Sequence, residues 1–97
     1  MKTRSGTIMT LKLISYDLSK PGRNYEDLYD SIKNIGTWWH CLESVWIVET
    51  NLSCGEIRDQ LSAYLDGNDK LAVLTLQGGW ATSGLSQECN DWLRNHL

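Results

Sequence analysis

Phenylalanine is absent from this sequence of 97 residues and proline occurs once, whereas tryptophan occurs five times and tyrosine four times. Five indole side chains are hard to bury completely in so small a domain. There is no run of 18 apolar residues and no signal-peptide pattern, so the sequence predicts a soluble, cytoplasmic protein. Nine Lys and Arg against twelve Asp and Glu give a net charge of −3, which argues against binding duplex DNA through a general basic surface. A local basic patch or a metal-bridged phosphate stays open.

Cysteine is scarce and its number is odd, with residues at positions 41, 54 and 89. No C-x-x-C motif is present, and no Cys/His pair has the spacing of zinc ligands. We therefore expect three reduced thiols with structural roles, as is usual in cytosolic proteins.

Apolar residues make up 41% of the chain and charged residues 22%, a balance typical of globular proteins rather than disordered ones. Residues 1–8 are polar and show no periodicity, which predicts a flexible arm. Residues 9–97 then have the length of one small domain.

The stretch 11–22, LKLISYDLSKPG, begins with the alternation of a strand and ends in Asp17, followed by a Pro-Gly turn. A carboxylate at the end of a central strand, beside Lys20 and Arg23, is a candidate metal or phosphate site. The two basic residues are accordingly candidates for binding RNA or DNA. The alternative is that Asp17 only caps the turn by accepting hydrogen bonds from backbone N–H groups, and that alternative is the more common.

The remaining chain alternates between strand and helix patterns. Strands are expected at 10–16, 37–42, 44–50 and 70–76. A first helix is expected from an N-cap at Asn24 to Gly36, and a second follows the Ser53/Glu56 capping box. A last helix is expected over 86–96.

This order, β-α-β-β-α-β followed by α, predicts an α+β, ferredoxin-like fold. The strands of the four-stranded antiparallel sheet would lie in the order 4-1-3-2, with the first two helices on one face. Asp17, the Glu43-Ser44 turn and the Asp69-Lys70 step would then meet at one edge. Asp17 and Asp69, with Ser44 between them, could hold a divalent cation such as Mg²⁺ that activates water or orients a phosphodiester. The competing interpretation, which we favour for Asp69, is that it belongs to a DGND turn.

The sequence contains a pattern that is seen elsewhere: a strand ending in Tyr16-Asp17, a helix ending at Gly36, a short strand and then Ser44-Val45-Trp46. It resembles the small CRISPR-associated proteins of spacer acquisition, once described as endoribonucleases, and the virulence-associated protein D ribonucleases. The resemblance covers about residues 11–76. It implies a ferredoxin-like homodimer in which Asp17 is the metal ligand and Ser44 lies near it.

The sequence departs from those families in its acidic first helix and in Trp46, where Phe is usual, so the resemblance is to a divergent branch. Three functions remain open: a metal-dependent ribonuclease or nuclease, a non-catalytic dimeric module, and a toxin–antitoxin-like regulator that binds a protein partner through its Trp-rich face. Trp38 and Trp39 are expected to point to opposite faces of the sheet. For His40 we favour a structural role over that of a general base.

The strands at 45–48 and 71–76 are apolar on both sides, so both faces of the sheet need to be covered. A last helix of about ten residues is too short to cover a whole face. We therefore expect a homodimer on the face that the first two helices leave open. Trp46 and Val48 would lie in that dimer interface if their side chains point to the open face.

Overall fold

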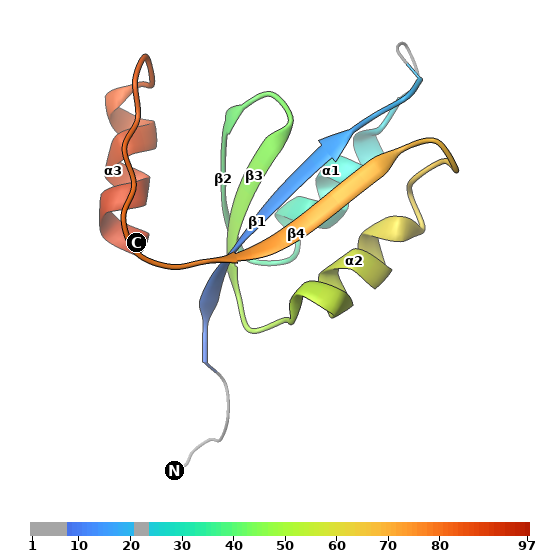
Figure 1. Cartoon of the computed structure of the whole chain (residues 1–97), viewed down its shortest axis with the longest axis horizontal. Coiled ribbons are helices and arrows are strands. Elements are labelled where there is room, and N and C mark those ends of the chain that lie inside the picture. Colours follow the sequence, from blue (N-terminus) through green and yellow to red (C-terminus); the bar gives the residue numbers. More distant parts are fainter. Residues whose placement is uncertain (1–7, 21–23) are drawn as a thin grey trace.

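Four strands and three helices follow one another in residues 8–20 and 24–97, which the computed structural model describes. Figure 1 shows them as β1 (Thr10–Asp17), α1 (Glu26–Lys33), β2 (Thr37–Leu42), β3 (Val45–Thr50), α2 (Cys54–Ser62), β4 (Lys70–Leu76) and α3 (Gln87–His96). Every predicted strand and helix is present, with ends within about two residues of the expected ones for all but the first helix. None of the helices in the described ranges is long and apolar enough to cross a membrane.

The sheet is antiparallel throughout, and its strands lie in the order β2-β3-β1-β4. This is the predicted order read from the other edge, so the topology is confirmed; at a coarse level it is consistent with a ferredoxin-like fold. In the register of β1 and β4, Asp17 lies opposite Lys70. The backbone N–H of Tyr16 donates to the carbonyl of Ser44 over 3.2 Å. The end of β1, the β2–β3 turn and the start of β4 therefore meet at one edge of the sheet, as expected.

Local capping explains where the helices begin. The capping box of α2 forms as predicted, because Ser53 accepts from the backbone N–H of Glu56 and the Glu56 carboxylate accepts from that of Ser53. The first helix begins at Glu26, one residue later than an N-cap at Asn24 implies, because Tyr25 is the N-cap and its carbonyl accepts from the N–H of Tyr29; the Asn24 side chain still accepts from the Glu26 N–H.

Gly36 lies in the turn between α1 and β2, after the last helical residue, Lys33. The backbone of Glu49 in β3 passes so close that a Cβ at position 36 would collide with its carbonyl oxygen. Glycine is therefore required here by a close approach of two backbones.

Helices α1 and α2 cover one face of the sheet (Figure 1). The core on this side contains the buried residues Ile14, Tyr16, Tyr25, Leu28, Ile32, Trp46, Val48, Ile57 and Leu61. Trp46 is only 1% exposed and its indole N–H donates to the hydroxyl of Tyr16 over 3.0 Å. Trp46 and Val48 were predicted to lie in a dimer interface if their side chains point to the open face. They point instead to the helix-covered face and are unavailable to a second chain. Alternation could not choose the face, because both sides of β3 are apolar.

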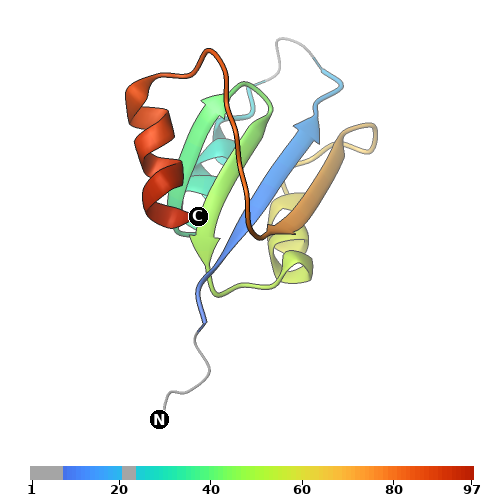
Figure 2. The same ribbon diagram turned by 60° about the vertical axis from the view of Figure 1, so that its left-hand side comes forward.

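Helix α3 lies on the opposite face of the sheet, and residues 77–86, which we call the strap, cross that face to reach it (Figure 2). A smaller core forms between them from Leu11, Trp39, Ile47 and Leu93. Trp39 is thus buried under α3, whereas Trp38 is partly exposed and contacts Trp46 on the other face, as the opposite orientation of neighbouring residues requires.

Cys41 in β2 and Cys89 in α3 form a disulfide, with 6.3 Å between their Cα atoms. The prediction of three reduced thiols is therefore wrong for two of them. Cys54 is the free thiol. Cys41 lies two residues after Trp39 and therefore on the same face of the sheet, where α3 brings Cys89 against it.

Candidate functional site

The Asp69 carboxylate accepts hydrogen bonds from several loop residues at the edge of the sheet where the candidate site was expected. One of its oxygens accepts from the backbone N–H of Ser19 at 2.7 Å and from the Ser19 hydroxyl at 2.8 Å. The other accepts from the backbone N–H of Asp66 at 2.8 Å. The Tyr25 hydroxyl donates to both oxygens, at 3.1 and 3.2 Å. Asp69 thereby ties the segment before α1 to the loop after α2.

These donors stabilise the charged form of the carboxylate. The backbone N–H of Ser19, then that of Asp66, and then the hydroxyls of Ser19 and Tyr25 lower the pKa of Asp69 from 3.8 to about 2. Because both oxygens are already occupied by protein donors, they do not fit the role of metal ligands. Within the described ranges, no group of three or more His, Cys, Asp and Glu side chains is arranged to hold a metal ion. The turn interpretation of Asp69 therefore explains its position.

Asp17 lies at the same edge but in a different environment. It is exposed at the end of β1, opposite Lys70, and its carboxylate has no hydrogen-bond or ion-pair partner among the described residues. Ser44 lies in the exposed β2–β3 turn and reaches β1 through its backbone carbonyl. Lys20 forms an exposed ion pair with Asp66, whose charges are 3.5 Å apart. Arg23 lies outside the described residues.

A column of aromatic rings runs from the α1-covered core to the β2 edge. His40 stacks flat on Trp46, with 3.7 Å between the ring centroids and an angle of 5° between the planes. Its Nδ1 lies 3.0 Å from the carbonyl oxygen of Val45, so this nitrogen carries the proton. Burial raises the pKa of the neighbouring Tyr16 hydroxyl. These contacts account for His40 as a structural residue.

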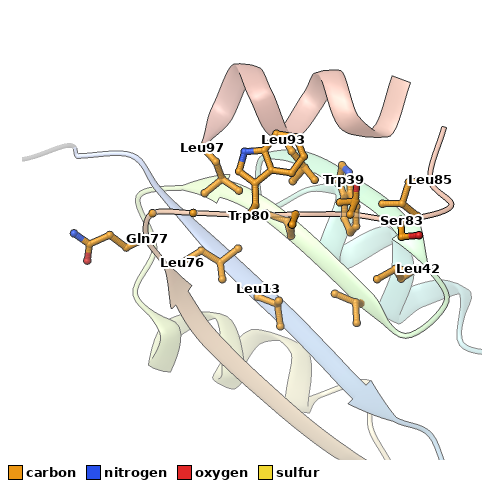
Figure 3. Close-up of a pocket in the computed structure, with 16 residues that line it drawn as sticks. Leu13, Trp39, Leu42, Leu76, Gln77, Trp80, Ser83, Leu85, Leu93 and Leu97 are labelled. Atoms are coloured by element: carbon orange, nitrogen blue, oxygen red, sulfur yellow. The ribbon is translucent and has the colours of Figure 1, made fainter. Parts of the chain in front are cut away.

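The sequence did not predict a groove on the α3 side of the sheet. It encloses about 370 Å³ between the sheet, the strap and α3. Figure 3 shows Leu13, Leu76 and Trp39 on the sheet, Leu93 on α3 and Leu97 directly after it, and Trp80 and Leu85 on the crossing strap. We call this feature the apolar groove. Its volume lies in the range of small-molecule and peptide sites.

Charge is missing from the lining of the apolar groove. Its polar side chains are those of the strap, Gln77, Thr82 and Ser83, and none of the lining side chains is ionisable. Gly78 and Gly84 have φ values of +88° and +82°, a left-handed conformation that glycine adopts without strain, and they set the path of the strap over the sheet. Residues 78–85, GGWATSGL, can be recognised in the sequence as a glycine-rich segment. Only the position of α3 shows that this segment encloses a groove.

Four exposed apolar side chains surround or adjoin the apolar groove. Leu42, Trp80 and Leu97 line it and are 48%, 38% and 37% exposed. Leu74 is 52% exposed and lies opposite Leu13 in the β1–β4 register, so the two side chains point to the same face. Chemically, the arrangement is suited to apolar contact rather than to proton transfer or charge stabilisation. No protein-family model matches the chain.

Proposed function

We propose that this protein is a non-catalytic interaction module, and that its first partner is a second copy of itself. The single observation that carries the proposal is the apolar groove, with exposed apolar side chains at its rim on one face of the sheet. Contiguous exposed apolar surface is uncommon on monomeric proteins and usually marks an interaction site. The non-catalytic dimer was one of the functions that the sequence left open.

A second copy suits this surface because the surface offers both a groove and an exposed apolar side chain, Leu74, on the same face. A twofold contact brings the same patch of each chain together, so the patch must be complementary to itself. Leu74 projects beside the apolar groove and can enter the groove of the partner chain. The absence of ionisable lining side chains also matters, because a chain with a net charge of −3 can pair here without bringing like charges into contact.

Sedimentation of the wild-type chain and of Leu74→Glu tests this proposal. The wild-type chain is expected to run at about twice its monomer mass of 11.1 kDa at micromolar concentration. Leu74→Glu is expected to run as a folded monomer, because dimerisation would bury an unpaired carboxylate.

Tyr64→Glu is the matched control, since Tyr64 is an exposed aromatic residue after α2, away from the apolar groove. It should leave the dimer intact. A wild-type chain that sediments as a monomer would overturn the proposal, and so would a Leu74→Glu variant that still dimerises.

The second candidate is a metal-dependent phosphodiesterase, the activity that the resemblance to CRISPR-associated and virulence-associated ribonucleases implies. The observation that favours it is Asp17, an exposed carboxylate at the end of a central strand that is not engaged by any described residue. Asp69 is not available as its partner, so any further ligands would have to come from the substrate, from water or from a second chain.

Incubating the purified protein with single-stranded RNA, with and without Mg²⁺, tests this candidate. If RNA is cleaved, Asp17→Asn is expected to abolish cleavage with no change in the unfolding curve, because the amide keeps the shape but loses the charge that a divalent ion needs. Cleavage that is unchanged in Asp17→Asn would remove Asp17 from the mechanism.

A further inference from the structure

The Cys41–Cys89 disulfide joins two elements that have few other ties. It links β2 to the first turn of α3 across 48 residues of sequence. Among the hydrogen bonds described for α3, one reaches the sheet, from the indole N–H of Trp39 to the carbonyl of Cys89 over 3.1 Å. A second, from Thr82 to Asn90, reaches only the strap. Leu93 is the helix residue that is fully buried. The strap that connects α3 to the sheet contains three glycines and no regular structure.

Both sulfur-bearing residues are partly exposed, and they line a second groove of about 360 Å³. The walls of this groove, which we call the disulfide groove, are Trp38, Trp39, His40, Glu88 and Trp92. It lies between the β2 edge and α3, whereas the apolar groove lies beneath the strap. A small thiol can enter a groove of this size, which a disulfide inside a packed core would not allow.

We propose that Cys41–Cys89 is a thiol-exchange site that takes small dithiol reductants, and that its reduction releases α3 from the sheet without unfolding the α1/α2 side. The inference rests on the disulfide groove and on the attachment of α3, and it does not depend on the proposed function. Thiols of two kinds, the monothiol glutathione and the protein dithiol thioredoxin, keep cysteines reduced inside cells.

The exchange takes place in two steps. One thiolate of the reductant attacks a protein sulfur, forming a mixed disulfide as the protein S–S bond breaks and the other cysteine leaves as a thiolate. The second reductant thiol then attacks the mixed disulfide and closes the reductant into a ring. Two electrons pass to the protein, two protons end on Cys41 and Cys89, and the oxidised reductant leaves as a cyclic disulfide.

Glu88 gives the site a charge preference. It is the one acidic residue among those lining the disulfide groove, and it precedes Cys89 in the chain. The attacking thiolate of an anionic reagent carries two negative charges and is repelled by this carboxylate, whereas in the thiolate of a cationic reagent the ammonium group balances the charge. At a separation of about 6 Å in water, each negative charge on the reagent lowers the rate roughly threefold before salt screening.

The first experiment reduces the full chain with dithiothreitol at neutral pH without denaturant. The chain carries Cys54→Ser, so that alkylation followed by mass measurement counts only the pair, because Cys54 is the free thiol and contacts Thr75 on the other face of the sheet. Two thiols are expected to appear. Hydrogen exchange of the α3 amides is expected to accelerate at least about tenfold, while the amides of β1, β3 and α1 keep their protection.

Three results would overturn the proposal: a pair that resists reduction until denaturant is added, a reduced chain whose α3 amides stay as protected as before, and a reduced chain that loses protection everywhere. The last result would make the disulfide a staple of the whole fold. The double variant Cys41→Ser, Cys89→Ser gives an independent reading of the released state. It should reproduce the exchange pattern of the reduced chain.

The second experiment compares the reduction rates for cysteamine, a cationic thiol, and 2-mercaptoethanesulfonate, an anionic one. Cysteamine is expected to react faster after correction for the thiolate fraction of each reagent, and Glu88→Gln should narrow the ratio. Asp91→Asn is the control, because the Asp91 carboxylate is already bound by Gln87 and Arg94. A ratio that Glu88→Gln leaves unchanged would overturn the disulfide groove as the route of attack.

Discussion

The two faces of the sheet are covered in different ways. The face under α1 and α2 is closed by a core in which Ile14, Trp46 and Val48 are almost completely buried. The face under α3 has a core of four buried residues, a disulfide and an apolar groove. The first face obtains its stability from packing along its whole length, whereas the second is covered over only part of its length.

This difference separates the part of the molecule that maintains the fold from the part that is open to a partner. Buried side chains that fill a core leave nothing for another molecule to contact. Half-covered apolar surface, in contrast, can be contacted by a partner. The exposed side chains of Leu42, Leu74 and Trp80 all belong to the α3 side. Substitutions on the two sides should therefore fail in different ways, one by unfolding the chain and the other by losing contacts of α3 or of a partner.

Trp46→Ala is expected to have the largest effect. Removing a fully buried indole leaves a cavity and also leaves the hydroxyl of Tyr16 without its donor, so the free energy of unfolding should fall by about 3–5 kcal/mol. Urea titration followed by circular dichroism measures this loss.

The control for this prediction is Leu42→Ala, a truncation of a half-exposed side chain at the rim of the apolar groove. Its effect should stay within about 0.5 kcal/mol of wild type. Equal losses for the two variants would contradict the division of the molecule into a closed and an open face.

The sequence predicted the elements and their order because each rests on local chemistry. The Ser53/Glu56 capping box and the β4 segment between two turns are both readable without tertiary contacts. The face to which β3 turns Trp46 was not readable. With Val45 and Ile47 on one side and Trp46 and Val48 on the other, alternation gives no preference, and the packing of α1 decides.

The candidate site shows the same limit. Topology correctly brought Asp17, Ser44 and Asp69 to one edge, because strand ends follow from strand order. It did not show that Ser19 and Tyr25 would fold back onto Asp69, since those contacts depend on the path of a loop. The pairing of Cys41 with Cys89 likewise depends on where α3 lies, which no periodicity in the sequence encodes.

Leu93→Ala should have an intermediate effect that is confined to the α3 side. Leu93 is the buried anchor of the helix, and truncating it should cost about 2 kcal/mol of local stability. Hydrogen exchange under oxidising conditions should show faster exchange of the α3 amides, with β1 and α1 unchanged.

Leu97→Ala provides the comparison, because Leu97 is partly exposed at the end of the same helix. It should change α3 exchange little. Faster exchange of the α1 and β1 amides in Leu93→Ala would show instead that the two faces unfold as one cooperative unit.

Asp69→Asn tests how the α1/α2 side is tied. Asp69 joins the segments that lead into α1 and out of α2 through hydrogen bonds, whereas α3 is tied by a covalent bond. Because folding lowers the pKa of Asp69 from 3.8 to about 2, its carboxylate stabilises the folded chain fully above about pH 4. That contribution is lost as the pH falls from about 4 to 2, as the group becomes protonated.

Thermal unfolding of the oxidised chain across this range should therefore show a falling midpoint in wild type and a flatter dependence in Asp69→Asn. Asp17→Asn, which removes a carboxylate without a described partner, should follow the wild-type curve, and an Asp69→Asn curve as steep as wild type would assign the acid sensitivity to other groups. Since protonation does not break a disulfide, α3 should keep its attachment under acid conditions that weaken the Asp69 tie, and a reductant at neutral pH should do the reverse.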